Sequence, residues 1–444
     1  MLSVLANRTY RNLFLAQIIA LVGTGLATVA LGLLAYEIAG ADSGAVLGTA
    51  MAIKMIAYIG VAPVVGAYAN RLPRRAFLIT MDLIRCGVAL MLPFVDQVWQ
   101  IYVLIFVLQS ASAGFTPTFQ ATIPDVLPDE AQYTRALSLS RLAYDMESLT
   151  SPILAAALLT VMNFHWLFSG TAVGFAASAL LVLATTLPLG TAKEIPGPIH
   201  EKTTRGARLY LRTPRLRGLL AVTLAAAAAS AMVIVNTPVL VRAALGLGQS
   251  EVAATLAAFG GGSMVAALLL PRLLDRLPDR KVMLSAAAAM TAILTALAFS
   301  WPLHTAPGYW SGLLAGWFLL GAAYSASITP GGRLLRRSSG SEDRPALFAA
   351  QFALSHVCWL VAYPLAGQVG ARVGMGGAFT VSAVLALVGT LIATRIWPRT
   401  DADVIGHDHP ELPDDHPHML EGHPKGSAVH SFVIDELHPN WPTR

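Results

Sequence analysis

The sequence predicts an all-α membrane protein, with twelve transmembrane helices arranged as two related six-helix halves. Three observations support this fold class. Of the 444 residues, 55% are hydrophobic and 12% are charged, whereas soluble domains are about 25% charged. Twelve apolar runs are each long enough, at about twenty residues, to cross a bilayer. Short patterns in the first half of the chain also recur in the second half.

The expected spans follow one another along the chain with short connections. The first apolar run, about residues 13–36, is longer than the apolar core of a signal peptide, so we expect it to remain as the first helix. The other expected spans are 44–69, 75–95, 98–121, 132–161, 165–188, 218–244, 249–273, 282–301, 307–331, 346–370 and 374–397. The spans predict an N-terminal half at 1–189, a cytoplasmic linker at 190–217, a C-terminal half at 218–397 and a tail at 398–444.

Three pairs of patterns relate the two halves. Asn-Arg-Leu-Pro at 70–73 recurs as Asp-Arg-Leu-Pro at 275–278, Phe-Thr-Pro at 115–117 as Ile-Thr-Pro at 328–330, and Ser-Pro-Ile-Leu-Ala at 151–155 as Tyr-Pro-Leu-Ala-Gly at 363–367. The offsets all fall between 205 and 213 positions. One nearly constant spacing is typical of duplicated membrane halves related by an axis along the membrane normal.

Lys and Arg gather in alternate loops, chiefly at 71–75, 193–217, 276–281 and 333–344. Because cytoplasmic loops carry an excess of Lys and Arg, we expect both termini in the cytoplasm and the protein in a bacterial inner membrane. The net charge of +5 follows from this topology and does not indicate nucleic acid binding.

The turn from Gly66 to Arg75 resembles the cytoplasmic loop signature of the major facilitator superfamily, G-x-L-x-D-R-x-G-R-R. This resemblance implies the major facilitator fold and a transporter whose loops gate access. Asn70 stands where the signature has Asp, while the second loop keeps the acid as Asp275. The alternative is that both loops are basic turns that only set topology. The candidate gating residues are Gly66, Asn70, Arg71, Arg74, Arg75, Asp275, Arg276 and Arg280.

Ionisable residues are few inside the apolar runs: Lys54, Asp82, Arg85, Asp145, Glu147 and His356. Charges at membrane depth are costly and usually face a partner or an aqueous cavity, so each is a functional candidate. Asp82 and Arg85 are three residues apart on one helical face and can neutralise each other. We expect a structural pair there, with a role in gating or substrate passage as the alternative.

Helices two, five and eleven flank the central cavity in the superfamily, so the resemblance implies that Lys54, Glu147 and His356 reach it. Asp145 and Glu147, two residues apart, cannot both line one face of a helix. Glu147 is the preferred proton carrier, and a salt bridge to Lys54 is the alternative. Residues 147–156 resemble the superfamily antiporter motif, G-x-x-x-G-P-x-x-G-G, and Glu147 stands where the motif has its first glycine. His356 is either a transport residue or a hydrogen-bonded packing residue.

The tail holds seven of the eleven histidines. Imidazole set among carboxylates suits nickel, cobalt, zinc or copper(II). The candidate metal ligands are His407, His409, His416, His418 and His423. The alternative is a disordered acidic tail that happens to contain histidine.

Residues 123–130 and 211–216 resemble the branch of the superfamily that contains bacterial siderophore, drug and metal exporters, and the histidine-rich tail resembles nickel and cobalt resistance exporters. The sequence therefore predicts a proton-coupled secondary exporter, without a cofactor or enzymatic activity, that acts as a monomer in the lipid bilayer. The sequence contains no Walker A pattern, G-x-x-x-x-G-K-[ST], which disfavours ATP-driven pumping. The substrate is a divalent metal or an amphipathic organic compound, and a non-transporting membrane sensor is a remote third possibility.

Overall fold

The structure is a computed structural model that describes residues 2–39, 43–68, 73–187, 199–340, 342–400, 404–408 and 427–431, together with residues 433, 434, 438 and 441. A short 3₁₀ helix, Leu2–Ala6, precedes the first long helix. The helices of the N-terminal half are α1 (Arg8–Ala39), α2 (Ser43–Tyr68), α3 (Arg74–Met91), α4 (Val98–Val126), α5 (Glu130–Leu159) and α6 (His165–Leu183).

A short helix, α7 (Ile199–Arg212), lies inside the predicted linker 190–217. The following helices are α8 (Pro214–Val239), α9 (Gln249–Leu274), α10 (Asp279–Ser300), α11 (Tyr309–Ile328), α12 (Gly331–Arg337), α13 (Arg344–Val373) and α14 (Met375–Ile396). In the tail, β1 (Val404–Asp408) pairs antiparallel with β2 (Ser427–Ser431), with Val404 opposite Ser431. The sequence pattern did not predict this two-stranded ribbon.

Eleven helices in the described part of the chain are long and apolar enough to cross a membrane. The 30-residue helix α5 is as long but is not among them. Five charged residues interrupt its apolar pattern: Glu130, Arg135, Arg141, Asp145 and Glu147. Helix α5 packs against α1 and α9, so part of its surface faces protein. With α5, the described residues form the predicted set of twelve long helices, and the all-α fold class is confirmed.

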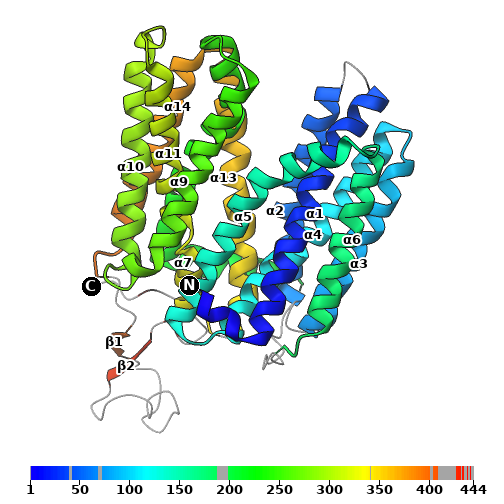
Figure 1. Cartoon of the computed structure of the whole chain (residues 1–444). Helices are drawn as coiled ribbons and strands as arrows, with labels where there is room; N and C mark the ends of the chain where they lie inside the picture. Colours follow the sequence, from blue (N-terminus) through cyan, green and yellow to red (C-terminus); the bar gives the residue numbers. More distant parts are fainter. Residues whose placement is uncertain are drawn as a thin grey trace.

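The long helices form two bundles (Figure 1). In one bundle α1 and α3 pack on α6 and α2 packs on α4, while in the other α8 and α10 pack on α14 and α9 packs on α11. The bundles meet where α2 contacts α13 and α5 contacts α9, and α7 lies against both α2 and α13. They spread apart toward the top of Figure 1 and approach each other at the end where α1 begins and α14 ends. The exact domain boundaries stay a prediction.

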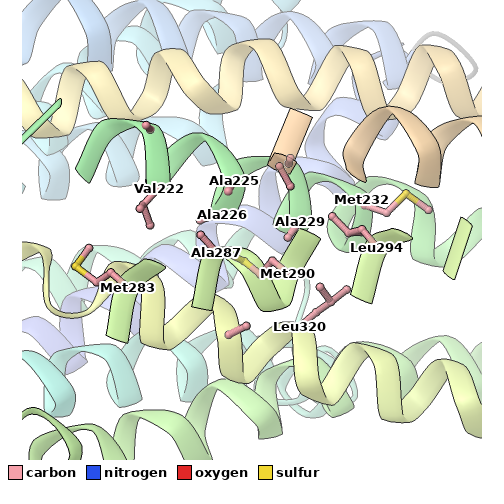
Figure 2. Close-up of a cluster of buried hydrophobic side chains, with 14 of the residues drawn as sticks. Val222, Ala225, Ala226, Ala229, Met232, Met283, Ala287, Met290, Leu294 and Leu320 are labelled. Atoms are coloured by element: carbon pink, nitrogen blue, oxygen red, sulfur yellow. The ribbon is translucent and has the colours of Figure 1, made fainter. Parts of the chain in front are cut away.

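The second bundle has its core around α8, which contributes Val222, Ala225, Ala226, Ala229 and Met232 (Figure 2). Small side chains allow helices to approach closely in a membrane, where packing rather than water exclusion drives association. At Gly389 on α14, for example, a Cβ atom would lie 2.6 Å from the carbonyl oxygen of Ala221. The alanine-rich face of α8 thus makes it the central helix of its half.

Candidate functional site

A cavity of about 640 Å³ lies between the two bundles and is lined by residues from both. Its wall is mostly apolar and aromatic, with residues from α1 to α6 on one side and from α8, α11, α12 and α13 on the other. The charged residues and the histidine in this wall are Lys54, Arg85, Arg141, Glu147 and His356. Pockets that bind drug-sized ligands have similar volumes, and their walls are likewise mostly apolar with a few polar groups.

Glu147 lines this cavity as a half-buried carboxylate on α5. The helical rise of 1.5 Å per residue puts it about 25 Å along α5 from Glu130, near the middle of the membrane-sized helix. Helix α1 passes close to it at Gly25, where a Cβ atom would lie 2.7 Å from Glu147 Oε1 and would also collide with Ser151 Oγ. The absence of a side chain at Gly25 therefore makes room for the carboxylate.

Gly25→Ala is expected to push Glu147 and Ser151 out of position, because the added methyl group overlaps both side chains. Overpacking of this kind costs about 2 kcal/mol. We expect lower transport in vesicles at an unchanged protein level. Gly32→Ala is the matched control, since a Cβ there meets nothing within 4 Å on the same helix. Equal transport by both variants would contradict the close approach of α1 to Glu147.

Lys54 and His356 both lie against the ring of Tyr58. The Lys54 Nζ atom is 5.5 Å from the centroid of the Tyr58 ring, and the imidazole of His356 meets the same ring edge-on at 4.7 Å. Because a carbonyl oxygen only accepts hydrogen bonds, His356 Nδ1–H donates to the Phe352 carbonyl oxygen at 2.6 Å. In this neutral form Nε2 is the ring nitrogen that can accept a hydrogen bond or a proton.

Asp145 takes a different position from Glu147, as their spacing on the helix requires. It is buried and forms an ion pair with Arg141, one turn earlier on α5. Ser263 on α9 donates its Oγ–H to Asp145 Oδ2 at 2.6 Å, and Arg141 Nε–H donates to Ser263 Oγ at 3.1 Å. These contacts join the two halves of the protein beside the cavity.

Asp82 and Arg85 form a buried ion pair on α3. Ser178 on α6 donates to Asp82 Oδ2 at 2.8 Å. The Arg85 guanidinium lies between two aromatic rings, 4.2 Å from the Phe115 centroid and 4.5 Å from the Phe175 centroid. The pair is thus held in place by α4 and α6, and Arg85 also belongs to the cavity wall.

Ion pairs join the two halves at the end where α1 begins and α14 ends. Arg74 at the start of α3 pairs with Asp125 near the end of α4, and Asp125 also pairs with Arg344 at the start of α13. A Cβ atom at Gly66, on α2, would lie 2.5 Å from the Cβ of Ala349 on α13. Arg75 donates to the Leu183 carbonyl oxygen. Asn70 and Arg71 lie outside the described residues.

A second set of ion pairs lies beside the first. Asp279 at the start of α10 pairs with Arg333 on α12 at 3.0 Å, and Arg333 pairs with Glu130 at the start of α5 at 2.7 Å. Arg337 also pairs with Asp279 at 3.0 Å. The predicted gating residues Asp275 and Arg276 are exposed, and Arg280 donates to the Trp397 carbonyl oxygen at 3.3 Å. The acid near this loop that forms ion pairs is therefore Asp279, which the repeated pattern did not single out.

The two sets, here called the first relay (Arg74, Asp125, Arg344) and the second relay (Asp279, Arg333, Glu130), correspond to each other through the internal repeat. Arg74 corresponds to Asp279, Asp125 to Arg333 and Glu130 to Arg344, at offsets of 205, 208 and 214 positions. Each position carries the opposite charge in the other relay. Each relay joins the start of a long helix in one half, at Arg344 or Glu130, to a residue of the other half, Asp125 or Arg333.

Of the five predicted metal ligands in the tail, His407 is the one within the described residues. His407 lies in β1, whereas His409, His416, His418 and His423 lie outside the described residues. No group of three metal-binding side chains occurs among the residues that the structure describes. Farther along, Ile434 and His438 are buried, and the Trp441 ring lies 4.9 Å from the Arg215 guanidinium at the start of α8.

The sequence is similar to a family of transporters and to individual efflux proteins. The sequence model of the Major Facilitator Superfamily matches residues 13–299 and 219–411. Over 152 residues the chain is 25% identical to macrolide efflux protein A of Enterococcus faecalis, covering 32% of this chain and 47% of the relative. Over 151 residues it is 24% identical to macrolide efflux protein A of Streptococcus pyogenes, covering 33% of this chain and 37% of the relative. The alignments thus span half or less of these relatives.

Solved structures resemble the whole fold. The human organic anion transporter MFSD10 superposes with a TM-score of 0.74 at 12% identity, covering 87% of this chain and 99% of that one. A bacterial homologue of the iron transporter ferroportin, in an outward-facing state, superposes with a TM-score of 0.71 at 14% identity, covering 87% and 98%. At these identities the likeness concerns the fold alone.

Proposed function

The chain belongs to the major facilitator superfamily, and from this premise we propose that it is a proton-coupled exporter of amphipathic organic compounds. The single observation that carries the proposal is Glu147, a carboxylate in a mostly apolar cavity between the two halves. An acid at this depth is suited to binding a proton from one side of the membrane and releasing it to the other.

The arrangement of the two halves supports alternating access around this cavity. The bundles spread apart at the end opposite to the start of α1, while the two relays hold them together at the other end. The excess of Lys and Arg in the loops at the relay end supports a cytoplasmic location for that end, in the inner membrane of a bacterial cell. In this orientation the structure is outward-facing.

A transport cycle follows from these features. In the outward-facing state, substrate leaves the cavity and Glu147 takes up a proton. Neutral Glu147 no longer needs water or Lys54 for charge compensation, so the halves can close around it. Opening of the relays then exposes the cavity to the cytoplasm, where the proton leaves and the next substrate enters. The protein needs no second copy for this cycle, and we propose a monomer.

Organic compounds fit the cavity better than metal ions do. Aromatic rings of Tyr58, Phe352 and Trp359 line it, and among the described residues Glu147 is its one carboxylate. Sites for nickel or cobalt are instead built from several imidazole and carboxylate ligands. The relatives named macrolide efflux protein also favour an organic substrate. Divalent metal efflux, with the histidine-rich tail as a local metal store, is the second candidate, and it depends on the tail alone.

Export is tested by expressing the chain in an efflux-deficient bacterium and measuring growth with a macrolide, a lipophilic cation, nickel and cobalt. We expect higher resistance to the organic compounds, and proton-driven uptake of the same compounds by inside-out vesicles. Resistance to metals alone would establish the second candidate. Vesicles that accumulate none of these solutes would favour a sensor over a transporter.

A further inference from the structure

Arg85 differs from the other charged residues of the cavity wall. Its side chain is almost fully buried, with 5% of its surface exposed, yet it belongs to the lining of the cavity. Within the described structure its Nε–H is buried without a hydrogen-bond acceptor. A buried donor without an acceptor is costly, and native proteins rarely keep one without a reason.

The surroundings of Arg85 hold the guanidinium in one orientation. Asp82 binds it from within the bundle and is itself fixed by Ser178. The rings of Phe115 and Phe175 lie against the guanidinium, and both rings also line the cavity. A donor held in this way loses little conformational freedom when it binds a ligand, which is the condition for a selective contact.

Arg141 provides a comparison within the same cavity wall. Its Nε–H donates to Ser263 Oγ, and its guanidinium pairs with Asp145. The hydrogen bonds of Arg141 thus hold the two halves of the protein together. Arg85 contacts Asp82 through a terminal nitrogen, and within the described residues its Nε–H has no acceptor. The donors of Arg85 are thus less fully engaged by protein than those of Arg141, although both residues line the cavity.

We propose that Arg85 is a hydrogen-bond donor to a neutral acceptor oxygen of the exported compound, such as the carbonyl of a lactone or ketone; this inference rests on the proposed export function. A neutral acceptor fits because Asp82 already compensates the charge of Arg85. A free carboxylate or phosphate would lose its hydration without gaining a net positive partner. Arg85 therefore selects compounds that carry acceptor oxygens from among the amphipathic compounds that fit the cavity.

The test compares two probes with and without acceptor oxygens in proton-loaded inside-out vesicles. Erythromycin carries a lactone and a ketone carbonyl, while tetraphenylphosphonium is a lipophilic cation without a hydrogen-bond acceptor. Arg85→Lys keeps the positive charge beside Asp82 but loses the planar fork of donors. We expect the KM for erythromycin to rise about tenfold, the effect of one lost hydrogen bond from a charged donor. The KM for tetraphenylphosphonium should stay within about twofold of the wild-type value.

Two further variants separate selection from structural damage. The double variant Asp82→Asn/Arg85→Met removes both charges together, so no unpaired charge stays buried, and it should show the same selective loss. Cys86→Ala alters the next residue on α3 without touching the guanidinium and should leave both KM values unchanged. An equal rise of both KM values, or no change in either, would overturn the assignment.

Binding to the purified protein in nanodiscs, followed by tryptophan fluorescence, keeps the two proposals apart. Wild-type protein that binds erythromycin about tenfold more tightly than Arg85→Lys, but accumulates neither probe in vesicles, retains the donor site while the export function fails. If the wild-type protein fails to bind erythromycin, the donor site is wrong, whichever compounds the vesicles transport.

Discussion

Glu147→Gln is expected to abolish uphill, proton-driven export, because the amide keeps the shape of the side chain and cannot release a proton. The protein should still reach the membrane, since Glu147 is half-buried at the cavity and not in the core of a bundle. Inside-out vesicles with an imposed proton gradient should show no net accumulation. Exchange of labelled for unlabelled substrate at equal concentrations should continue, because exchange needs no net proton movement.

Lys54→Ala shows whether Glu147 acts alone. If the carboxylate is only half of a structural salt bridge, removal of Lys54 should be as damaging as Glu147→Gln. If Glu147 carries the proton, transport in the Lys54 variant should persist with a displaced pH profile. Full uphill transport by Glu147→Gln would reduce Glu147 to a packing residue.

Asp125→Asn is expected to release the first relay. Asp125 holds both Arg74 and Arg344, and all three side chains are mostly buried. Loss of one partner of a buried ion pair costs about 3 kcal/mol, which shifts the balance away from the closed cytoplasmic side by roughly a hundredfold. A cysteine placed at Leu335 in the cavity wall, with both native cysteines replaced, should then be alkylated much faster from the cytoplasmic side.

Asp275→Asn is the matched control for this experiment. Asp275 occupies the acidic position of the repeated loop pattern but is exposed, so its loss should leave the alkylation rate unchanged. The second relay already has the opposite polarity, so the triple variant Arg74→Asp/Asp125→Arg/Arg344→Glu should restore slow alkylation. Fast alkylation with Asp275→Asn, or with the wild type, would contradict the assignment of the relays.

Much of the fold could be predicted because long apolar runs leave few choices in a membrane. The expected second span, 44–69, differs from α2 (Ser43–Tyr68) by one residue at each end. The span 132–161 was assigned to α5 although charged residues interrupt it, and it lies within two residues of the observed helix at both ends. Regular backbone hydrogen bonding in lipid forces such segments into helices whatever their polar content.

The relays illustrate what sequence alone could not supply. The repeated order of residues 70–73 and 275–278 directed attention to Asp275, whereas the structure pairs Asp279 with Arg333 and Arg337. Corresponding positions in the two halves, such as Arg74 and Asp279, carry opposite charges. A comparison that looks for similar residues does not detect this correspondence. Asp125 was part of a recognised pattern, but its two partners come from α3 and α13 and depend on packing across the halves.

The residues of the cavity could likewise be predicted only in part. Glu147, Lys54 and His356 could be singled out as rare polar residues, and all three belong to its wall. Arg85 was expected to pair with Asp82, and the two form an ion pair, while a purely structural role for the pair stays a prediction. Its access to the cavity depends on the rings of Phe115 and Phe175, contributed by two other helices. Gly25 gave no sequence signal, because its role appears only when α1 lies against α5.

The polar character of α5 has a consequence for the biogenesis of the protein. During synthesis, a helix with Arg141, Asp145 and Glu147 near its centre partitions poorly from the translocon into lipid, since each charge there costs about 3 kcal/mol. Pairing of Arg141 with Asp145 within the helix lowers this cost. The remainder must come from helices already in the bilayer, and α1, which packs on α5, is made first. Contacts with neighbouring helices therefore keep α5 in the bilayer. The hydrogen bond from Ser263 to Asp145 can form only after α9 has been translated.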